Sequence, residues 1–89
     1  MFNYKKVEKI TNSLLLELGE DPKREGLMKT PLRVAKAWEF FSKGYNEDLN
    51  KVINDAIFNE KAKDMVIVQN VEFFSLCEHH LLPFFGKAH

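Results

Sequence analysis

The hydrophobic pattern of this chain changes from helical to strand-like near residue 64, and this change constrains the fold more than any other feature. Up to Phe58, apolar side chains recur at spacings of three and four residues, which is the period of an α-helix. From Met65 to Phe74 they form a nearly continuous run rich in β-branched residues, which favours an extended strand. The sequence therefore predicts an α+β fold with an N-terminal helical region at 1–64 and a strand region at 65–89.

Two helices are expected in the first forty-odd residues, at about 2–18 and 31–42. The first carries an apolar stripe and ends at Gly19, after which 20–29 form a polar connector. The second has a start signal, because Thr30 is a good N-cap and the missing N–H of Pro31 is not needed in a first turn. The stripe of the first helix is Val7, Ile10, Leu14 and Leu18, and that of the second, expected in the core, is Val34, Ala37, Trp38 and Phe41.

A third, shorter helix is expected to begin near Asn46 or Asp48 and to run to about Phe58, followed by a charged loop at 59–64. Its apolar positions are Leu49, Val52, Ile53, Ala56 and Ile57. We expect a strand at 65–76, bulged around Gln69 and Asn70, and a returning strand at 84–89 after the turn that Pro83 breaks.

Cys77-Glu78-His79-His80 follows the predicted strand and contains the chain's only cysteine. A thiolate and an imidazole three residues apart converge on one ion where the backbone turns, and Zn²⁺ favours sulfur and nitrogen donors. His79 is expected to leave the backbone in another direction from His80, which frees it for proton transfer near neutral pH. So short a pattern also arises by chance, and context must decide.

Two longer motifs supply that context. Residues 75–87 (SLCEHHLLPFFGK) resemble the zinc and catalytic signature of GTP cyclohydrolase I, in which CEHH is followed by Gly-Lys. Residues 26–38 (GLMKTPLRVAKAW) resemble the TP-x-R-V/I-A-K helix of the same family. The two motifs agree with the family in order and spacing, and the resemblance covers about residues 7–89.

The resemblance implies a zinc-dependent hydrolase that converts GTP to 7,8-dihydroneopterin triphosphate and formate, the first step of tetrahydrofolate and pterin biosynthesis. It implies Cys77 and His80 as zinc ligands and His79 as the catalytic proton donor. It also implies a tunnelling-fold (T-fold) antiparallel sheet, begun by 65–89, and a ring-shaped homodecamer. For Glu78 two roles stay open, because it either orients a histidine or zinc-bound water, or simply forms an ion pair.

Arg33 and Lys36 lie three residues apart on one face of the second predicted helix, beside its apolar stripe. Taken alone, such charges are most often solvated surface groups. The resemblance places both at motif positions that contact the substrate triphosphate, for which the forked donors of arginine are well suited.

The family pattern is incomplete in these residues. A catalytic zinc uses three protein ligands, but the second zinc cysteine, a further histidine and the guanine-binding carboxylate of the family are absent from the sequence. We therefore expect a truncated, N-terminal part of the enzyme, and treat His89 as a strand residue. The alternatives are a catalytically inactive fragment that acts only as an assembly or interaction module, and another tunnelling-fold pterin or deazapurine enzyme. Zinc-independent enzymes of the latter kind have no need of the Cys77–His80 pair.

Composition excludes several other classes. The formal net charge of +0 gives no basic surplus of the kind that nucleic-acid-binding proteins carry. The four glycines form no P-loop, so a triphosphate must be held by side chains. No apolar run is long enough for a signal peptide or membrane span, and one cysteine makes no internal disulfide, so the cytoplasm is the expected compartment. With 89 residues the chain buries a modest core, which favours a partner.

Overall fold

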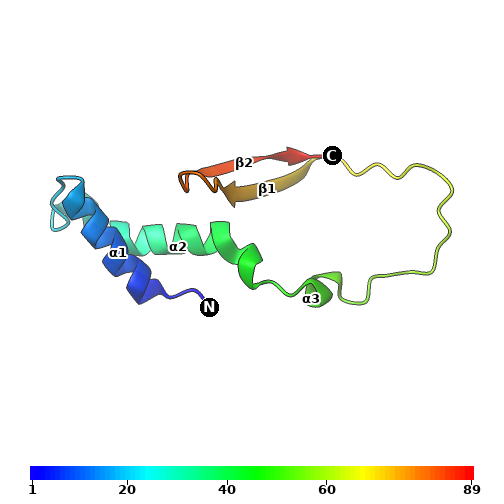
Figure 1. Ribbon diagram of the computed structural model, residues 1–89, viewed down its shortest axis with the longest axis horizontal. Coiled ribbons are helices and arrows are strands. Elements are labelled where there is room, and N and C mark those ends of the chain that lie inside the picture. Colours follow the sequence, from blue (N-terminus) through cyan, green and yellow to red (C-terminus); the bar gives the residue numbers. More distant parts are fainter. The chain divides into compact units, whose positions relative to one another are not determined.

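The computed structural model describes residues 1–89 and confirms the α+β class, with helices followed by a two-stranded antiparallel sheet (Figure 1). It divides into two compact units, a helical unit (Met1–Phe40) and a hairpin unit (Phe41–His89). The elements in chain order are α1 (Tyr4–Glu17), the 3₁₀ turn η1 (Glu25–Leu27), α2 (Thr30–Ser42), the 3₁₀ turn η2 (Lys43–Asn46), α3 (Leu49–Ile53), β1 (Val71–Leu76) and β2 (Pro83–Ala88). None of the helices combines the length and apolar character that a membrane span requires.

Helix α1 matches the predicted first helix to within two residues. Asn3 caps it, because its side-chain oxygen accepts a backbone N–H of the first turn at 3.0 Å. Gly19 ends it in the left-handed region (φ 86°). The amides of Gly19 and the next residue donate to the carbonyls of Leu16 and Leu15, each at 3.0 Å, which is a Schellman cap. The role predicted for Gly19 is confirmed.

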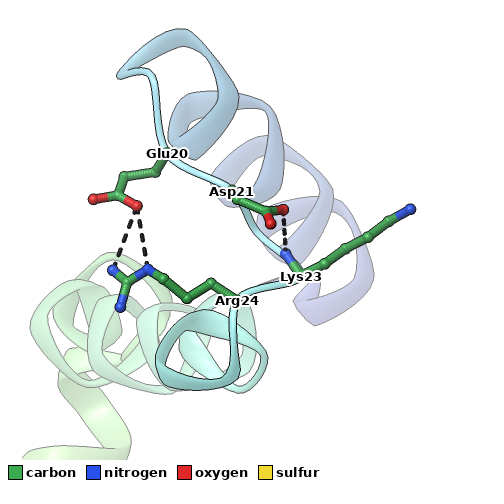
Figure 2. A network of polar contacts seen from close by, with 4 residues as sticks. All are labelled: Glu20, Asp21, Lys23 and Arg24. Atoms are coloured by element: carbon green, nitrogen blue, oxygen red, sulfur yellow. Dashed lines mark hydrogen bonds and ion pairs between the residues drawn. The ribbon is translucent and has the colours of Figure 1, made fainter.

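The connector between α1 and α2 is held by local polar contacts (Figure 2). The Asp21 carboxylate accepts the backbone N–H of Lys23 at 3.0 Å, which closes a tight turn. The Glu20 carboxylate lies 3.4 Å from both the Nε and Nη2 atoms of Arg24. These contacts join residues at most four apart, so the polar connector expected from the sequence forms from its own side chains.

Helix α2 begins one residue earlier than predicted. The Lys29 carbonyl accepts the first helical hydrogen bond, from the Arg33 N–H at 3.1 Å, so Thr30 is already helical rather than capping. Pro31 still lies within the first turn, where its missing N–H leaves no carbonyl unpaired. The helix ends at Ser42 as predicted, and η2 continues it by one 3₁₀ turn.

Few side chains are buried, and they are not those of the predicted stripes. Ala35 (0% exposed) and Thr11 (7%) are the buried residues, and the Thr11 hydroxyl donates to the Val7 carbonyl at 2.8 Å. Trp38 is half-buried. The expected core stripes are therefore wrong in part. The buried positions lie beside the stripes, and four members of the stripes are exposed: Ile10, Leu14, Leu18 and Ala37.

The third helix is much shorter than predicted. Asp48 caps α3 by accepting an N–H at 2.9 Å, and the helix ends after five residues. Asn54 (φ 48°) and Asp55 (φ 56°) take the left-handed conformation, which these two residue types tolerate better than most. Leu49, Val52 and Ile57 are exposed and Ile53 alone of the stripe is half-buried, so little apolar surface covers the stripe to favour further turns.

The predicted strand at 65–70 is also wrong, because strand β1 covers only the residues that β2 can pair. The register runs from Val71 opposite Ala88 to Leu76 opposite Pro83. Residues 65–70 have no partner strand, and β-propensity alone does not hold an extended segment. Asn70 (φ 59°) precedes β1 instead of forming a bulge within it. The returning strand is confirmed to within one residue.

Cross-strand pairs organise the two faces of the hairpin. On one face, Phe74 lies opposite Phe85, with ring centroids 6.3 Å apart, and Glu72 lies opposite Lys87. A shallow hollow of about 380 Å³ on this face is lined by Glu72, Phe74, Phe85, Gly86 and Lys87. The Glu72–Lys87 pair lies toward the end of the hairpin remote from its turn, and the Phe74–Phe85 pair lies near the middle of the ladder.

The other face depends on a glycine. The Phe73 ring covers Gly86, where an added Cβ would lie 2.9 Å from the ring carbon Cζ. Phe73 also meets Phe84 edge to face, with centroids 6.1 Å apart. Gly86 therefore permits a close approach that no other residue type allows without movement of the ring.

Candidate metal and catalytic site

The turn between β1 and β2 carries the predicted metal ligands and is closed by its own backbone. Cys77 follows β1 directly, and its N–H donates to the Leu82 carbonyl at 2.9 Å. The Leu81 N–H donates back to the Cys77 carbonyl at 2.8 Å. Leu81 takes a left-handed φ of 60° between these two bonds. Figure 1 shows this turn as the end of the hairpin opposite the C-terminus.

Both histidines of the turn approach the thiol. The Cys77 Sγ atom lies 3.8 Å from His80 Nε2 and 3.9 Å from His79 Nδ1. The two rings approach the sulfur from neighbouring positions in the turn, and the expected proton-transfer role of His79 stays a prediction. His79, two residues along, reaches the sulfur with the ring nitrogen nearer its backbone, whereas His80 reaches it with the farther one. Cys77 is half-buried and both histidines are exposed.

These distances suit a zinc ion. Bond lengths of about 2.3 Å to sulfur and about 2.0–2.1 Å to nitrogen place the two donors of a tetrahedral zinc about 3.6 Å apart. The 3.8 Å between Cys77 Sγ and His80 Nε2 is within a few tenths of that value. No group of three or more donors that could hold a metal is present. In its donor distance, the Cys77–His80 pair is therefore compatible with two ligands of a tetrahedral zinc ion.

Glu78 contacts one histidine rather than the other. Its Oε1 atom lies 3.6 Å from His79 Nε2, with both side chains largely exposed. His79 thus has the thiol near one ring nitrogen and a carboxylate near the other. An exposed pair of this kind contributes little to stability. Two roles were left open for Glu78, orientation of a histidine or zinc-bound water and a simple ion pair. Both include contact with a histidine, so this contact does not decide between them.

Arg33 and Lys36 are both exposed on α2, within the helical unit. Residues three apart in a helix are neighbours on its surface, so the two cations form a pair on one face. Neither takes part in an ion pair; Arg24 of the connector does. The two cations are free to meet an anion from solution.

Sequence reasoning missed the role of Leu81. Leucine is not a residue type that signals a left-handed backbone. The only nearby signal was Pro83, which indicates a break but not the conformation of the residue two before it.

Comparison with known proteins assigns the chain to a family. The sequence model of GTP cyclohydrolase I matches residues 7–89. A protein named GTP cyclohydrolase 1 from Porphyromonas gingivalis is 67% identical over 72 residues, which are 81% of this chain and 37% of that relative. Proteins of the same name from Leptospira biflexa and Alkalilimnicola ehrlichii are 53% and 56% identical over 93% and 94% of this chain. The chain spans less than half the length of these curated relatives, 37% to 45%.

Proposed function

The chain belongs to the GTP cyclohydrolase I family, and on that premise we propose that it supplies zinc and triphosphate ligands to an enzyme that converts GTP to 7,8-dihydroneopterin triphosphate and formate. The closed turn that holds Cys77 Sγ 3.8 Å from His80 Nε2 carries this proposal. The intact enzyme here means these 89 residues together with the further residues that the relatives have. In it, 65–89 begin a tunnelling-fold catalytic domain and 1–64 form a helical region before it.

Cys77 and His80 are the proposed zinc ligands, with a third from the further residues. The fit of the donor distance and the soft sulfur–nitrogen donor set support zinc. When bound, zinc activates a water for attack near neutral pH. The turn holds the Cys77 thiol and the His80 imidazole close together, so that these two residues would supply two of the ligands of such an ion.

His79 is the proposed proton donor. In the family reaction water adds at C8 of the guanine, the imidazole ring opens, and C8 leaves as formate before the ribose rearranges and a pterin ring closes. Protonation of a ring nitrogen by His79 makes C8 more electrophilic. The Glu78 carboxylate lies 3.6 Å from His79 Nε2, a contact that supports either orientation of that ring or a simple ion pair.

Arg33 and Lys36 are the proposed triphosphate contacts. Their exposure and the lack of carboxylate partners leave both cations available. Two cations are few for a group with about four negative charges, so further basic residues are needed. In a homodecameric ring these come from the rest of the chain and from neighbouring subunits.

Zinc content and formate release test the proposal together. We expect the intact enzyme to hold zinc and release formate from GTP, and Cys77→Ala to lose both. The 89-residue chain alone should hold zinc weakly, because it supplies too few ligands. Full zinc occupancy in Cys77→Ala would contradict the ligand assignment, and tight stoichiometric zinc in the 89-residue chain would contradict the need for a third ligand.

The second candidate is an inactive assembly module. Its support is the large exposed apolar side chains, such as Phe85 (80%) and Ile10 (66%), and the unpaired outer edges of a two-stranded sheet. A chain that joins a larger assembly without any formate release from that assembly would favour this candidate over the enzyme.

A further inference from the structure

Leu81 stands apart from the other residues with a left-handed backbone. The non-glycine residues with positive φ are Asn54, Asp55, Asn70 and Leu81. Asn and Asp tolerate this region because their short polar side chains bond to nearby backbone, and leucine has no such compensation. An unfavourable backbone of this kind persists where the surrounding structure fixes it, and it is concentrated at functional sites.

The Leu81 side chain does not explain its conformation. It is 51% exposed, so packing holds it only in part. Its backbone, by contrast, lies between the two hydrogen bonds that close the turn, Leu81 N–H to the Cys77 carbonyl at 2.8 Å and Cys77 N–H to the Leu82 carbonyl at 2.9 Å. A left-handed residue at this place reverses the chain so that both bonds form at once.

The same reversal sets the geometry of the proposed ligands. Cys77 is the first residue of the closed turn and His80 immediately precedes Leu81. With an ordinary right-handed or extended backbone at Leu81, Leu82 would no longer face Cys77. The hydrogen bond from the Cys77 N–H, which closes the turn around Cys77 and His80, would then be lost. Ligands that are ordered in advance bind more tightly, because less conformational freedom is lost on binding.

We propose that Leu81 is a positioning residue for the metal turn: its left-handed backbone holds Cys77 and His80 at ligating distance before the metal arrives. This inference rests on the proposed zinc role of those two residues. It assigns no contact between Leu81 and substrate or metal, and it predicts that the backbone preference at position 81 matters more than the side chain.

The test compares variants that separate backbone from side chain in the intact enzyme. Leu81→Ile keeps the number of side-chain carbon atoms but introduces a β-branch, which strongly disfavours positive φ. Leu81→Asn and Leu81→Gly discard the apolar side chain but tolerate positive φ. Metal-free protein is titrated with Co²⁺, and the thiolate-to-cobalt charge-transfer band reports binding through Cys77. The thermal midpoint of each metal-free variant is measured alongside.

We expect Leu81→Ile to bind Co²⁺ about tenfold more weakly, and Leu81→Asn and Leu81→Gly to remain within about threefold of the wild type. The reverse order, with Ile retained and Asn and Gly weakened, would show that the side chain matters and would overturn the inference. Equal binding by all variants would overturn it while leaving the zinc assignment intact. Absence of a thiolate band in the wild type would overturn the zinc assignment itself, and this inference with it.

Discussion

The helical unit and the hairpin are specified over different ranges of sequence. In the helical unit, caps and turns join residues at most five apart, as at Asn3, Gly19 and the Glu20–Arg24 pair. In the hairpin, Val71 pairs with Ala88 and the aromatic rings meet across the strands. Local polar contacts thus determine where the helices begin and end, whereas a strand forms only where a partner strand pairs with it. The proposed triphosphate contacts lie on a helix of the helical unit, and the proposed metal ligands lie in the turn of the hairpin.

The largest expected effect on stability tests whether the helical unit also depends on packing. Ala35 is 0% exposed, so Ala35→Leu should overpack its surroundings and lower the free energy of unfolding by about 1–3 kcal/mol. Ala37→Leu is the matched control, because Ala37 is exposed on the same helix. Thermal unfolding followed by circular dichroism measures both. Equal midpoints for the two variants would mean that local signals alone hold this unit.

A smaller effect is expected in the hairpin, at the glycine beneath Phe73. The Cβ of Gly86→Ala would lie 2.9 Å from Phe73 Cζ, so the ring must move and cross-strand packing weakens, at a cost of about 1–2 kcal/mol. Gly44→Ala is the control, since no atom lies within 4 Å of a Cβ there. Amide hydrogen exchange in β1 should accelerate only in the Gly86 variant. Unchanged exchange would show that the ring adapts without loss.

The cap of α1 should contribute less again. Asn3→Ala removes the acceptor of an N–H at 3.0 Å and should cost about 0.5–1 kcal/mol. Asn12→Ala, in the exposed interior of the same helix, should instead be neutral or slightly stabilising, because alanine is the better helix former. Chemical unfolding measures the free energy of unfolding of both variants. An equal loss of stability in Asn12→Ala and Asn3→Ala would show that the cap bond does not stabilise the helix.

The smallest effect on folding is expected at Arg33, where binding should suffer instead. Arg33→Ala removes an exposed, unpaired charge, so the thermal midpoint should hardly change. In the intact enzyme, GTP should bind about tenfold more weakly while guanosine is unaffected, and the deficit should shrink as salt rises. Arg24→Ala, another exposed arginine, is the control and should leave GTP binding intact. Equal losses for GTP and guanosine would remove Arg33 from phosphate recognition.

The features predicted correctly from the sequence were those with a local signal. Gly19 ends α1, Pro31 lies in the first turn of α2, and the return strand begins within one residue of its predicted start after Pro83. Apart from the N-cap expected at Thr30, which is already helical, the errors fall where a distant partner decides the outcome. Apolar spacing at 54–58 and β-branched residues at 65–70 predicted a helix and a strand, but no surface or strand covers either segment.

The candidate site shows the same division. The sequence predicted Cys77 at a strand end and a turn after it, since both follow from local pattern. The approach of His79 to the thiol and the left-handed Leu81 were not foreseen, because they depend on side-chain rotation and on ring closure through two backbone bonds. Sequence spacing of two or three residues does not determine which ring nitrogen faces a neighbouring sulfur.

The most direct test of the proposed function compares His79→Ala with His80→Ala in the intact enzyme, measuring zinc content and formate release from GTP in each. Both histidines lie within 4 Å of the thiol, so geometry alone does not rank them. We predict that His80→Ala loses zinc and activity together, whereas His79→Ala keeps zinc but releases no formate. Loss of zinc in His79→Ala, with zinc and formate release retained in His80→Ala, would contradict the assignment of the two residues.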